Sequence, residues 1–109
     1  MNEYHVQITD AALEDMDELY EYIAYKLLAP ENAIGQYNRI ADEILKLSVM
    51  PERCHIMDVE PWKTRELRRM NVDNYSVFYK IVGKHVIVTD VLYSASDIEK
   101  RLRVASKFV

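Results

Sequence analysis

Residues 65–93, with the sequence RELRRMNVDNYSVFYKIVGKHVIVTDVLY, decide the fold of this 109-residue chain. β-Branched and aromatic residues are frequent in this stretch, and turn signals divide it into segments of strand length. The turn signals are the polar run Asn71–Asn74 and the pair Gly83-Lys84. We therefore predict three consecutive strands, of which the last is apolar enough to be central: Arg65–Met70, Tyr75–Ile81 and His85–Tyr93.

Upstream of these strands, apolar residues recur at helical spacing in two segments. The first segment has one apolar stripe, made of Leu13, Met16, Tyr20, Ile23 and Leu27. The second has a similar stripe, made of Ala33, Tyr37, Ile40, Ile44 and Leu47. Thr9 and Asp10 offer N-cap oxygens to the first helix, while Pro30 suits the first turn of the second and Pro51 ends it. Because the link is short, we predict an antiparallel helical hairpin, with exposed tyrosines at its rim, Tyr22 and Tyr25.

A short strand and a short helix complete the predicted order of elements. Tyr4–Ile8 alternates as a strand does, and Ser96–Glu99 matches a capping box that begins a helix. The order β-α-α-β-β-β-α predicts an α+β fold, in which the helical hairpin packs on one face of a small, mostly antiparallel sheet. The first strand can pair in parallel, since the hairpin carries the chain across the sheet. Residues 1–109 should form a single domain, because two domains would each be too small for a core.

The composition is that of a globular protein and carries no pattern typical of a membrane span or a secreted chain. Half of the residues are hydrophobic, but the uncharged apolar runs are far shorter than the ~20 residues that a span needs. Met1–His5 lacks the basic and then apolar pattern of a secretion signal. Cys54 is the one cysteine, which excludes a disulfide framework and a thiol-based metal site. We expect a cytoplasmic protein that binds no membrane, no metal and no other cofactor.

The net charge of −4 is unevenly distributed along the chain. Residues 1–62 contain 4 Lys and Arg against 13 Asp and Glu, whereas residues 63–109 contain 10 against 5. A protein that coats nucleic acid would be basic overall, which excludes that class. The C-terminal half can still offer a local basic surface to RNA or to an acidic protein, although solvated helix faces explain the same asymmetry.

Several short motifs, in order along the chain, resemble those of a known family of small toxins. In the N-terminal half the motifs are Ile8-Thr9-x-x-Ala12, Glu21-Tyr22-Ile23-Ala24, Leu27-x-x-Pro30-x-x-Ala33 and Leu47-x-x-x-Pro51. In the C-terminal half they are Arg68-x-Met70-x-Val72-x-Asn74-Tyr75-x-Val77-Phe78-Tyr79 and Val91-Leu92-Tyr93. Their order and spacing resemble the RelE/ParE superfamily, and the helical part is closest to its ParE-type members.

The resemblance implies a growth-inhibiting toxin of a bacterial type II toxin–antitoxin system, of the kind linked to plasmid stabilisation. Such a toxin is neutralised by a cognate antitoxin that wraps around it, and a homodimer or a toxin–antitoxin hetero-oligomer is possible. Two modes of action occur in the superfamily. RelE-like members cut mRNA on the ribosome, whereas ParE-like members trap DNA gyrase on DNA. The helical motifs favour the ParE-like mode.

The RelE-like alternative can be stated as chemistry. Metal-free RNA cleavage needs a group that takes the 2′-OH proton, cations that hold charge on the phosphorane, and an acid for the leaving oxygen. The candidate catalytic residues are Arg68, Arg65 and Tyr93. The candidate binding residues are Lys63, Arg69, Lys80, His85, Arg101 and Lys107. Arg68 stands where the superfamily pattern has a phosphate-facing arginine, so we expect Arg68→Ala to abolish toxicity and to leave the melting temperature nearly unchanged.

One departure from the pattern weakens the RelE-like reading. Many relatives have an arginine between the last strand and the final helix, where this chain has Ser96. A serine cannot give a phosphate the fixed, bidentate cation that arginine provides. The departure also leaves open an inactive relative that acts only as a binding module.

Simpler interpretations stand beside these for single residues. Arg65, Arg68 and Arg69 can form a charged strand edge that prevents aggregation. His85 beside a turn is more often a surface residue than a general base. Trp62 either packs in the core, which we favour, or lines an antitoxin groove.

Overall fold

The computed structural model describes residues 3–102 and has the predicted order of elements. Its strands are β1 (His5–Ile8), β2 (Arg68–Val72), β3 (Tyr75–Val82) and β4 (His85–Tyr93). Its α-helices are α1 (Asp10–Glu21), α2 (Pro30–Leu45) and the short α3 (Ile98–Arg101), and a π-helix, Tyr22–Lys26, extends α1. Single 3₁₀ turns follow α2, at Lys46–Ser48 and Pro51–Arg53. The α+β class and the element order are confirmed.

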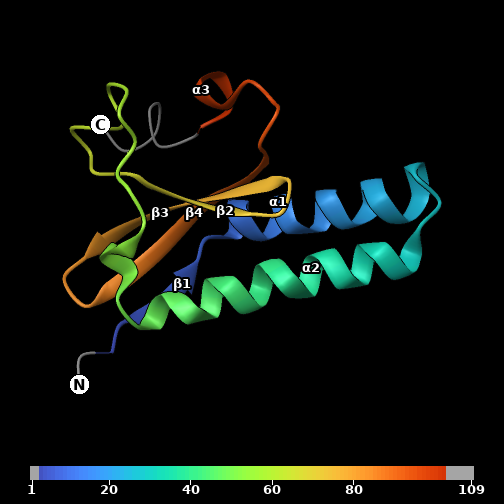
Figure 1. Cartoon of the computed structure of the whole chain (residues 1–109), viewed down its shortest axis with the longest axis horizontal. Helices are drawn as coiled ribbons and strands as arrows, with labels where there is room; N and C mark the ends of the chain where they lie inside the picture. Colours follow the sequence, from blue (N-terminus) through green and yellow to red (C-terminus); the bar gives the residue numbers. More distant parts are fainter. Residues whose placement is uncertain (1–2, 103–109) are drawn as a thin grey trace.

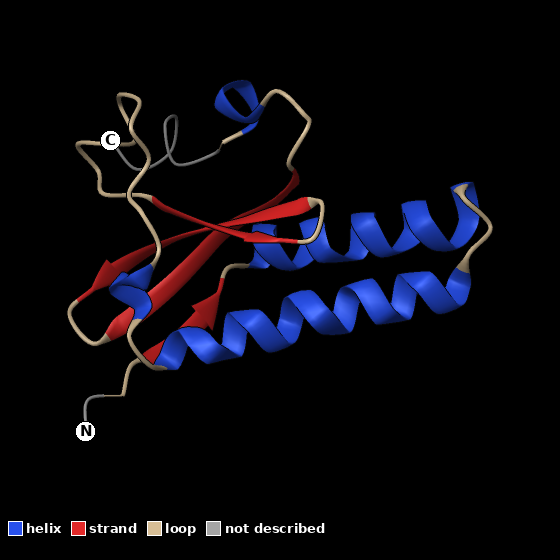
Figure 2. Ribbon diagram, in the orientation of Figure 1, coloured by secondary structure: helices blue, strands red, loops and turns tan. Residues whose placement is uncertain are grey.

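The four strands form one sheet in the order β1-β4-β3-β2, with the helical hairpin along one face (Figure 1). β1 pairs with β4 in parallel, and the other neighbours are antiparallel. Figure 2 shows α1 and α2 side by side, with the final helix and the segment before β2 on the far side of the sheet. We call the face under the hairpin the helix face and the opposite face the open face. No helix within residues 3–102 is both long and apolar enough to cross a bilayer.

The sheet differs from the sequence prediction at the start of its second strand. β2 begins at Arg68 and runs through Val72, whereas we expected a strand from Arg65 and a turn from Asn71. Glu66 has a φ of 57°, which no strand residue adopts, so the chain before Leu67 turns instead. The β2–β3 turn is only two residues long and relies on the left-handed backbone of Asp73, with a φ of 54°.

The larger core lies between the hairpin and the helix face. α2 contributes the predicted stripe, in which Ile40, Ile44 and Leu47 are fully buried. α1 instead buries Ala12, Asp15, Met16 and Leu19, while Leu13 and Leu27 are 41% and 56% exposed, so the stripe predicted for α1 is wrong at its two ends. At the start of α1, the small side chain of Ala12 packs in the core against the sheet, and the neighbouring Leu13 therefore points away from it. Leu27 lies beyond the π-helix, whose wider turn bonds the Leu27 N–H to the Tyr22 carbonyl and shifts the helical phase.

A second, smaller core covers one end of the open face. The connecting segment, residues 54–67, and α3 pack there around Phe78, with the buried side chains Trp62, Leu67, Leu92, Ile98 and Leu102. The core position of Trp62 is therefore confirmed. The capping box is wrong in detail, because α3 follows Asp97 without a side-chain cap, and the Ser96 hydroxyl donates to the Tyr93 carbonyl instead at 2.6 Å.

β4 continues well past the end of its partner β1, and α1 supplies the missing acceptor. Pairing between the two strands ends at Ile8 and Val88. Beyond it, a β-bulge interrupts the β3–β4 register between Phe78 and Tyr79. The Val91 N–H then donates to a carboxylate oxygen of Asp15 at 3.0 Å, in a buried position. The carboxylate of Asp15 thus accepts the hydrogen bond that a carbonyl of a neighbouring strand accepts elsewhere in the sheet, so the buried Val91 N–H has a partner.

Asp15→Ala should lower the free energy of unfolding by about 1–3 kcal/mol, because the Val91 N–H would stay buried without its acceptor. Urea denaturation measures the change. Asp17→Ala, an exposed carboxylate on the same helix, is the matched control and should change stability by less than about 0.5 kcal/mol. Equal stability of the two variants would contradict this role of Asp15.

Candidate functional site

The sheet divides the candidate residues of the sequence analysis between its two faces. On β2 and β3, Arg69 and Lys80 alternate with residues of the larger core and therefore lie on the open face, and His85 lies on the same face of β4. Tyr93 shares the phase of Val91, which belongs to the larger core, so it lies on the helix-face side. The groups expected to act together on RNA are thus separated by the sheet.

Arg69 is held on the open face by a polar network. Its Nε atom donates to the Ser76 hydroxyl at 3.0 Å and to the Asn71 side-chain oxygen at 3.2 Å. The guanidinium also lies 5.6 Å from the centre of the Phe78 ring, within range of a cation–π contact. The Ser76 hydroxyl in turn lies 2.8 Å from that of Ser94 beyond the end of β4. The structure fixes this arginine in place and leaves it half-buried.

Arg68 alternates with Arg69 along β2 and therefore lies on the helix-face side of the sheet. It anchors the chain at the start of the connecting segment. Its Nη1 atom donates to the carbonyl of Cys54 at 2.7 Å and to that of Glu52 at 3.1 Å. The Tyr79 hydroxyl donates to the Pro51 carbonyl at 2.6 Å in the same region, and burial raises the pKa of this phenol. Arg68 therefore contributes to the folded structure directly, which corrects our expectation that its removal would leave the melting temperature unchanged.

The remaining predicted residues are spread over the surface. Lys63 lies in the connecting segment with its ammonium 3.6 Å from Asp58 and 60% of the side chain exposed, and Arg65 is half-buried there. Lys107 lies outside the described residues. Arg101, on α3, shares a groove with Tyr93. Tyr93 and Arg101 are thus two predicted residues that the structure brings together at one cavity.

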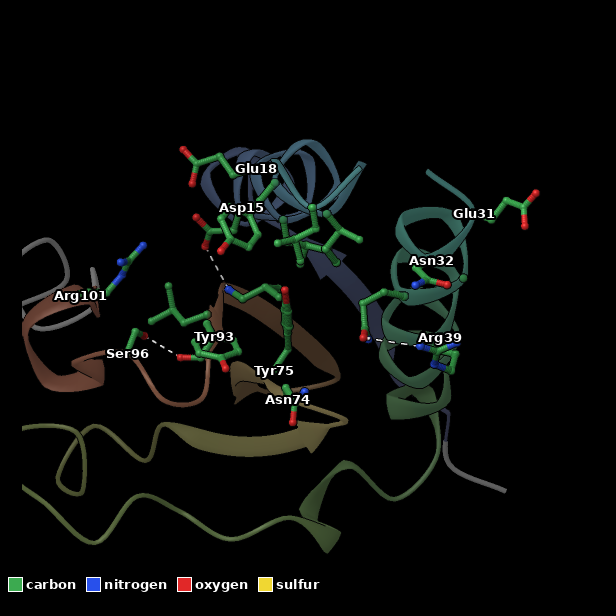
Figure 3. Close-up of a pocket in the computed structure, with 18 residues that line it drawn as sticks. Asp15, Glu18, Glu31, Asn32, Arg39, Asn74, Tyr75, Tyr93, Ser96 and Arg101 are labelled. Carbon is green, nitrogen blue, oxygen red and sulfur yellow. Dashed lines mark hydrogen bonds between the residues drawn. The ribbon is translucent and has the colours of Figure 1, made fainter. Parts of the chain in front are cut away.

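This groove, with a volume of about 840 Å³, separates the hairpin from the end of the sheet (Figure 3). One wall comes from α1, the π-helix and the start of α2, and the other from the β2–β3 turn, the end of β4 and α3. Its apolar and aromatic lining is Leu19, Tyr22, Ile23, Leu27, Tyr75, Val91, Leu92 and Tyr93. Tyr22, Leu27 and Tyr93 are each more than half exposed, so the groove presents apolar surface to solvent. Such a surface is typical of a binding site.

Tyr75 and Tyr93 contact each other in the groove, and Tyr22 lies near them on the helical wall. The rings of Tyr75 and Tyr93 contact edge to face, with centroids 5.7 Å apart, and Figure 3 shows them beside each other below α1. Burial raises the pKa of Tyr75, and the nearby phenols of Tyr93 and Tyr22 raise it further. Tyr75 is therefore a neutral phenol at physiological pH, able to donate a hydrogen bond or pack against an apolar group but unable to act as a base.

The charges around the groove nearly balance. Arg39 is bound to Asp73, with its Nε 2.8 Å from the carboxylate, and this pair holds the pKa of Asp73 below its usual value. Glu18, Glu31 and Arg101 remain at the rim. A groove with so little positive charge does not suit a phosphate ligand, and its phenols and aliphatic side chains suit an apolar segment of a protein.

Sequence reasoning identified parts of this groove without assembling them. Tyr22 was expected at the hairpin rim and Tyr93 as a candidate catalytic residue, but Tyr75 and Leu27 were missed as lining residues. Both were assigned to regular elements, and nothing in the local pattern distinguishes a residue that faces a groove from one that faces the core. The proximity of Tyr75 to Tyr93 depends on the β-bulge, which the sequence analysis did not predict.

Arg68→Ala should lower the melting temperature by at least about 5 °C, because two main-chain carbonyls would lose a charged donor. Lys63→Ala is the control: it also removes a cation, but from a side chain that is 60% exposed. It should leave the melting temperature within about 2 °C of the parent. Differential scanning calorimetry compares the two. An unchanged transition for Arg68→Ala would show that the anchoring bonds contribute nothing to stability.

Comparison with known proteins places the chain in a family. A family model described as the ParE toxin of the type II toxin–antitoxin system parDE matches residues 6–98. No curated protein sequence matches.

Solved structures share the fold at low sequence identity. A structure of the chromosomal ParDE system of P. aeruginosa superposes with a TM-score of 0.69 and 17% identity, covering 83% of this chain and 95% of that one. The RelBE2 toxin–antitoxin complex of Mycobacterium tuberculosis gives 0.62 and 19%, covering 88% and 97%. A mutant E. coli RelE toxin in the free state gives 0.63 and 11%, covering 94% and 96%. With a family match that spans most of its length, the chain belongs to the ParE toxin family of type II toxin–antitoxin systems.

Proposed function

We propose that this toxin inhibits growth by binding DNA gyrase, as the ParE-like mode implies, and that it does not cleave RNA. The observation that carries the proposal is the separation of the candidate catalytic residue Tyr93 from the candidate binding residues Arg69 and Lys80. Tyr93 lies in the groove, whereas Arg69 and Lys80 lie on the open face of the sheet. Concerted acid–base catalysis requires the proton-transfer group within hydrogen-bond reach of the reacting atoms, and a cation on the far side of a sheet cannot serve the same phosphate.

Two further observations support a non-hydrolytic toxin. Arg68 donates to two carbonyls and is not directed at a ligand. Along β3, the partner of Arg68 is Tyr79 and the partner of Tyr93 is Tyr75, so the two are offset by roughly 13 Å along the strands and lie on opposite sides of β3. Ser96 donates its hydroxyl to a main-chain carbonyl, so it does not replace the arginine of RelE-like relatives. Binding a protein target needs none of these groups to converge.

The alternative is a RelE-like endoribonuclease, and one observation favours it. The open face carries Arg69, Lys80 and His85. His85 is the register partner of Val82, and Lys80 is two residues before Val82 on β3. A row of cationic or titratable side chains on a sheet can hold an RNA backbone. This alternative needs a proton-transfer group on the same face, for which His85 is the one candidate of the sequence analysis.

A gyrase assay and a translation assay distinguish the two modes. The purified toxin should inhibit gyrase supercoiling and accumulate cleaved DNA complexes, and it should leave mRNA intact in a reconstituted translation reaction. Arg69→Ala and Lys80→Ala should retain at least half of the growth inhibition, because the open face would not carry the activity. Codon-dependent mRNA cleavage with normal supercoiling would overturn the proposal in favour of the RelE-like mode. A folded protein inactive in both assays would favour the binding-module reading.

We further propose that the groove receives an apolar segment of the cognate antitoxin. The ParDE and RelBE2 structures with this fold are toxin–antitoxin systems, and the groove, with a volume of about 840 Å³, is open to solvent along its apolar wall. Its exposed apolar wall and its nearly balanced charge favour hydrophobic docking there. The basic C-terminal half remains a candidate for an additional acidic contact, which would make the affinity depend on salt.

Tyr22→Asp should weaken the complex with the antitoxin encoded in the neighbouring reading frame by about 10- to 100-fold, because it puts a charge into an apolar contact. Tyr25→Asp is the matched control. It lies on the same π-helix, is 70% exposed against 53% for Tyr22, and does not line the groove. Isothermal titration calorimetry measures both affinities. Equal weakening by the two substitutions, or by neither, would place the antitoxin elsewhere.

A further inference from the structure

Two histidines face each other at the junction of the N-terminal strand with the sheet. His5 of β1 and His85 of β4 are direct partners in the parallel register. Their rings lie with centroids 5.5 Å apart and planes inclined by 33°. Both residues are exposed and lie on the open face, away from the groove and from the larger core. The gyrase-binding function and the antitoxin groove proposed above use neither histidine.

The spacing suits a shared divalent transition-metal ion. Zn²⁺ binds imidazole nitrogens at about 2.0–2.1 Å in tetrahedral geometry, which puts the centroids of two coordinated rings about 5 Å apart. The observed centroid separation of 5.5 Å is close to this value. We propose that His5 and His85 together bind a divalent cation of the zinc type, with water or an incoming ligand in the remaining positions. Residues 3–102 contain no group of three or more potential His, Cys, Asp or Glu ligands, so within this range the two rings are the ligands of the proposed site.

The neighbouring side chains support this assignment. The Gln7 side-chain amide lies 3.4 Å from Nδ1 of His85. The contact is made by the amide nitrogen Nε2 of Gln7. A turn of the amide by 180° about its last side-chain bond puts the oxygen there instead, where it accepts the Nδ1 proton and leaves Nε2 of His85 free for the cation. Lys84 precedes His85 in the sequence, and its ammonium lies over the Tyr4 ring, 4.9 Å from the ring centre. Lys80 lies on the same face as His85: it is two residues before Val82 on β3, and Val82 is the register partner of His85.

Binding at this place would join β1 to the rest of the sheet. β1 has four residues, and β4 is its one strand partner. A ligand that binds the paired strands but not the separated ones stabilises the pairing. The sequence analysis expected no metal because the chain has a single cysteine, and it did not pair these two histidines, which are 80 positions apart.

Titration of the untagged full-length toxin with Zn²⁺, followed by calorimetry, tests the proposal. We expect one ion per chain, a higher melting temperature, and slower amide hydrogen exchange at Val6 and Ile8. His5→Asn and His85→Asn should each weaken binding about tenfold or more and abolish the exchange effect. His55→Asn, which replaces the third histidine of the chain, should bind as the parent does. Circular dichroism verifies that the variants fold, as expected for exposed positions.

The two single variants also separate this site from simpler ones. A site formed by His5 with the amino terminus would survive His85→Asn, and that outcome would overturn the proposal. Equal losses in all three histidine variants would indicate unspecific binding and would overturn it too. So would the absence of any stabilisation at tenfold excess of Zn²⁺ over protein. The measurements do not depend on toxicity, so they stand whether or not gyrase is the target.

Discussion

One extra residue in β4 sets the geometry of the functional end of this protein. Counted from the Gly83-Lys84 turn, regular pairing would place Tyr75 opposite Leu92, but the β-bulge brings it opposite Tyr93. Because side chains alternate along a strand, this shift moves Tyr93 from the open face to the helix-face side. The distorted strand stays in place because Asp15 on α1 accepts the hydrogen bond of the Val91 N–H.

The bulge also explains why the protein has two distinct surfaces. Without it, Tyr93 would join Arg69 and Lys80 on the open face, and aromatic and cationic groups would converge there. With it, the tyrosines line an apolar groove between hairpin and sheet, while the cations stay on the other face. The groove suits a protein ligand and the open face suits an anionic or metal ligand, so the sheet keeps two kinds of chemistry apart. This separation is what favours a protein-binding toxin over a nuclease.

The sequence predicted regular elements well and their junctions poorly. The α2 stripe was correct because Ala33, Ile40 and Ile44 lie on an uninterrupted helix with a single period. The α1 stripe failed at Leu27, where a π-helix changes the period without any signal in the residue pattern. Arg68 was expected to face a ligand because strand alternation does not reveal which carbonyls a loop brings near it.

The sequence by itself determined the class of the fold and the order of its elements, because hydrophobic periodicity and turn residues act over short distances along the chain. It also indicated the family, through the resemblance of its motifs. Tertiary structure alone decided which side chains meet. The pairing of Tyr75 with Tyr93, the contact of His5 with His85 and the bond from Val91 to Asp15 all join residues far apart in the sequence. Such contacts depend on strand register and helix phase, and a single inserted residue changes either one.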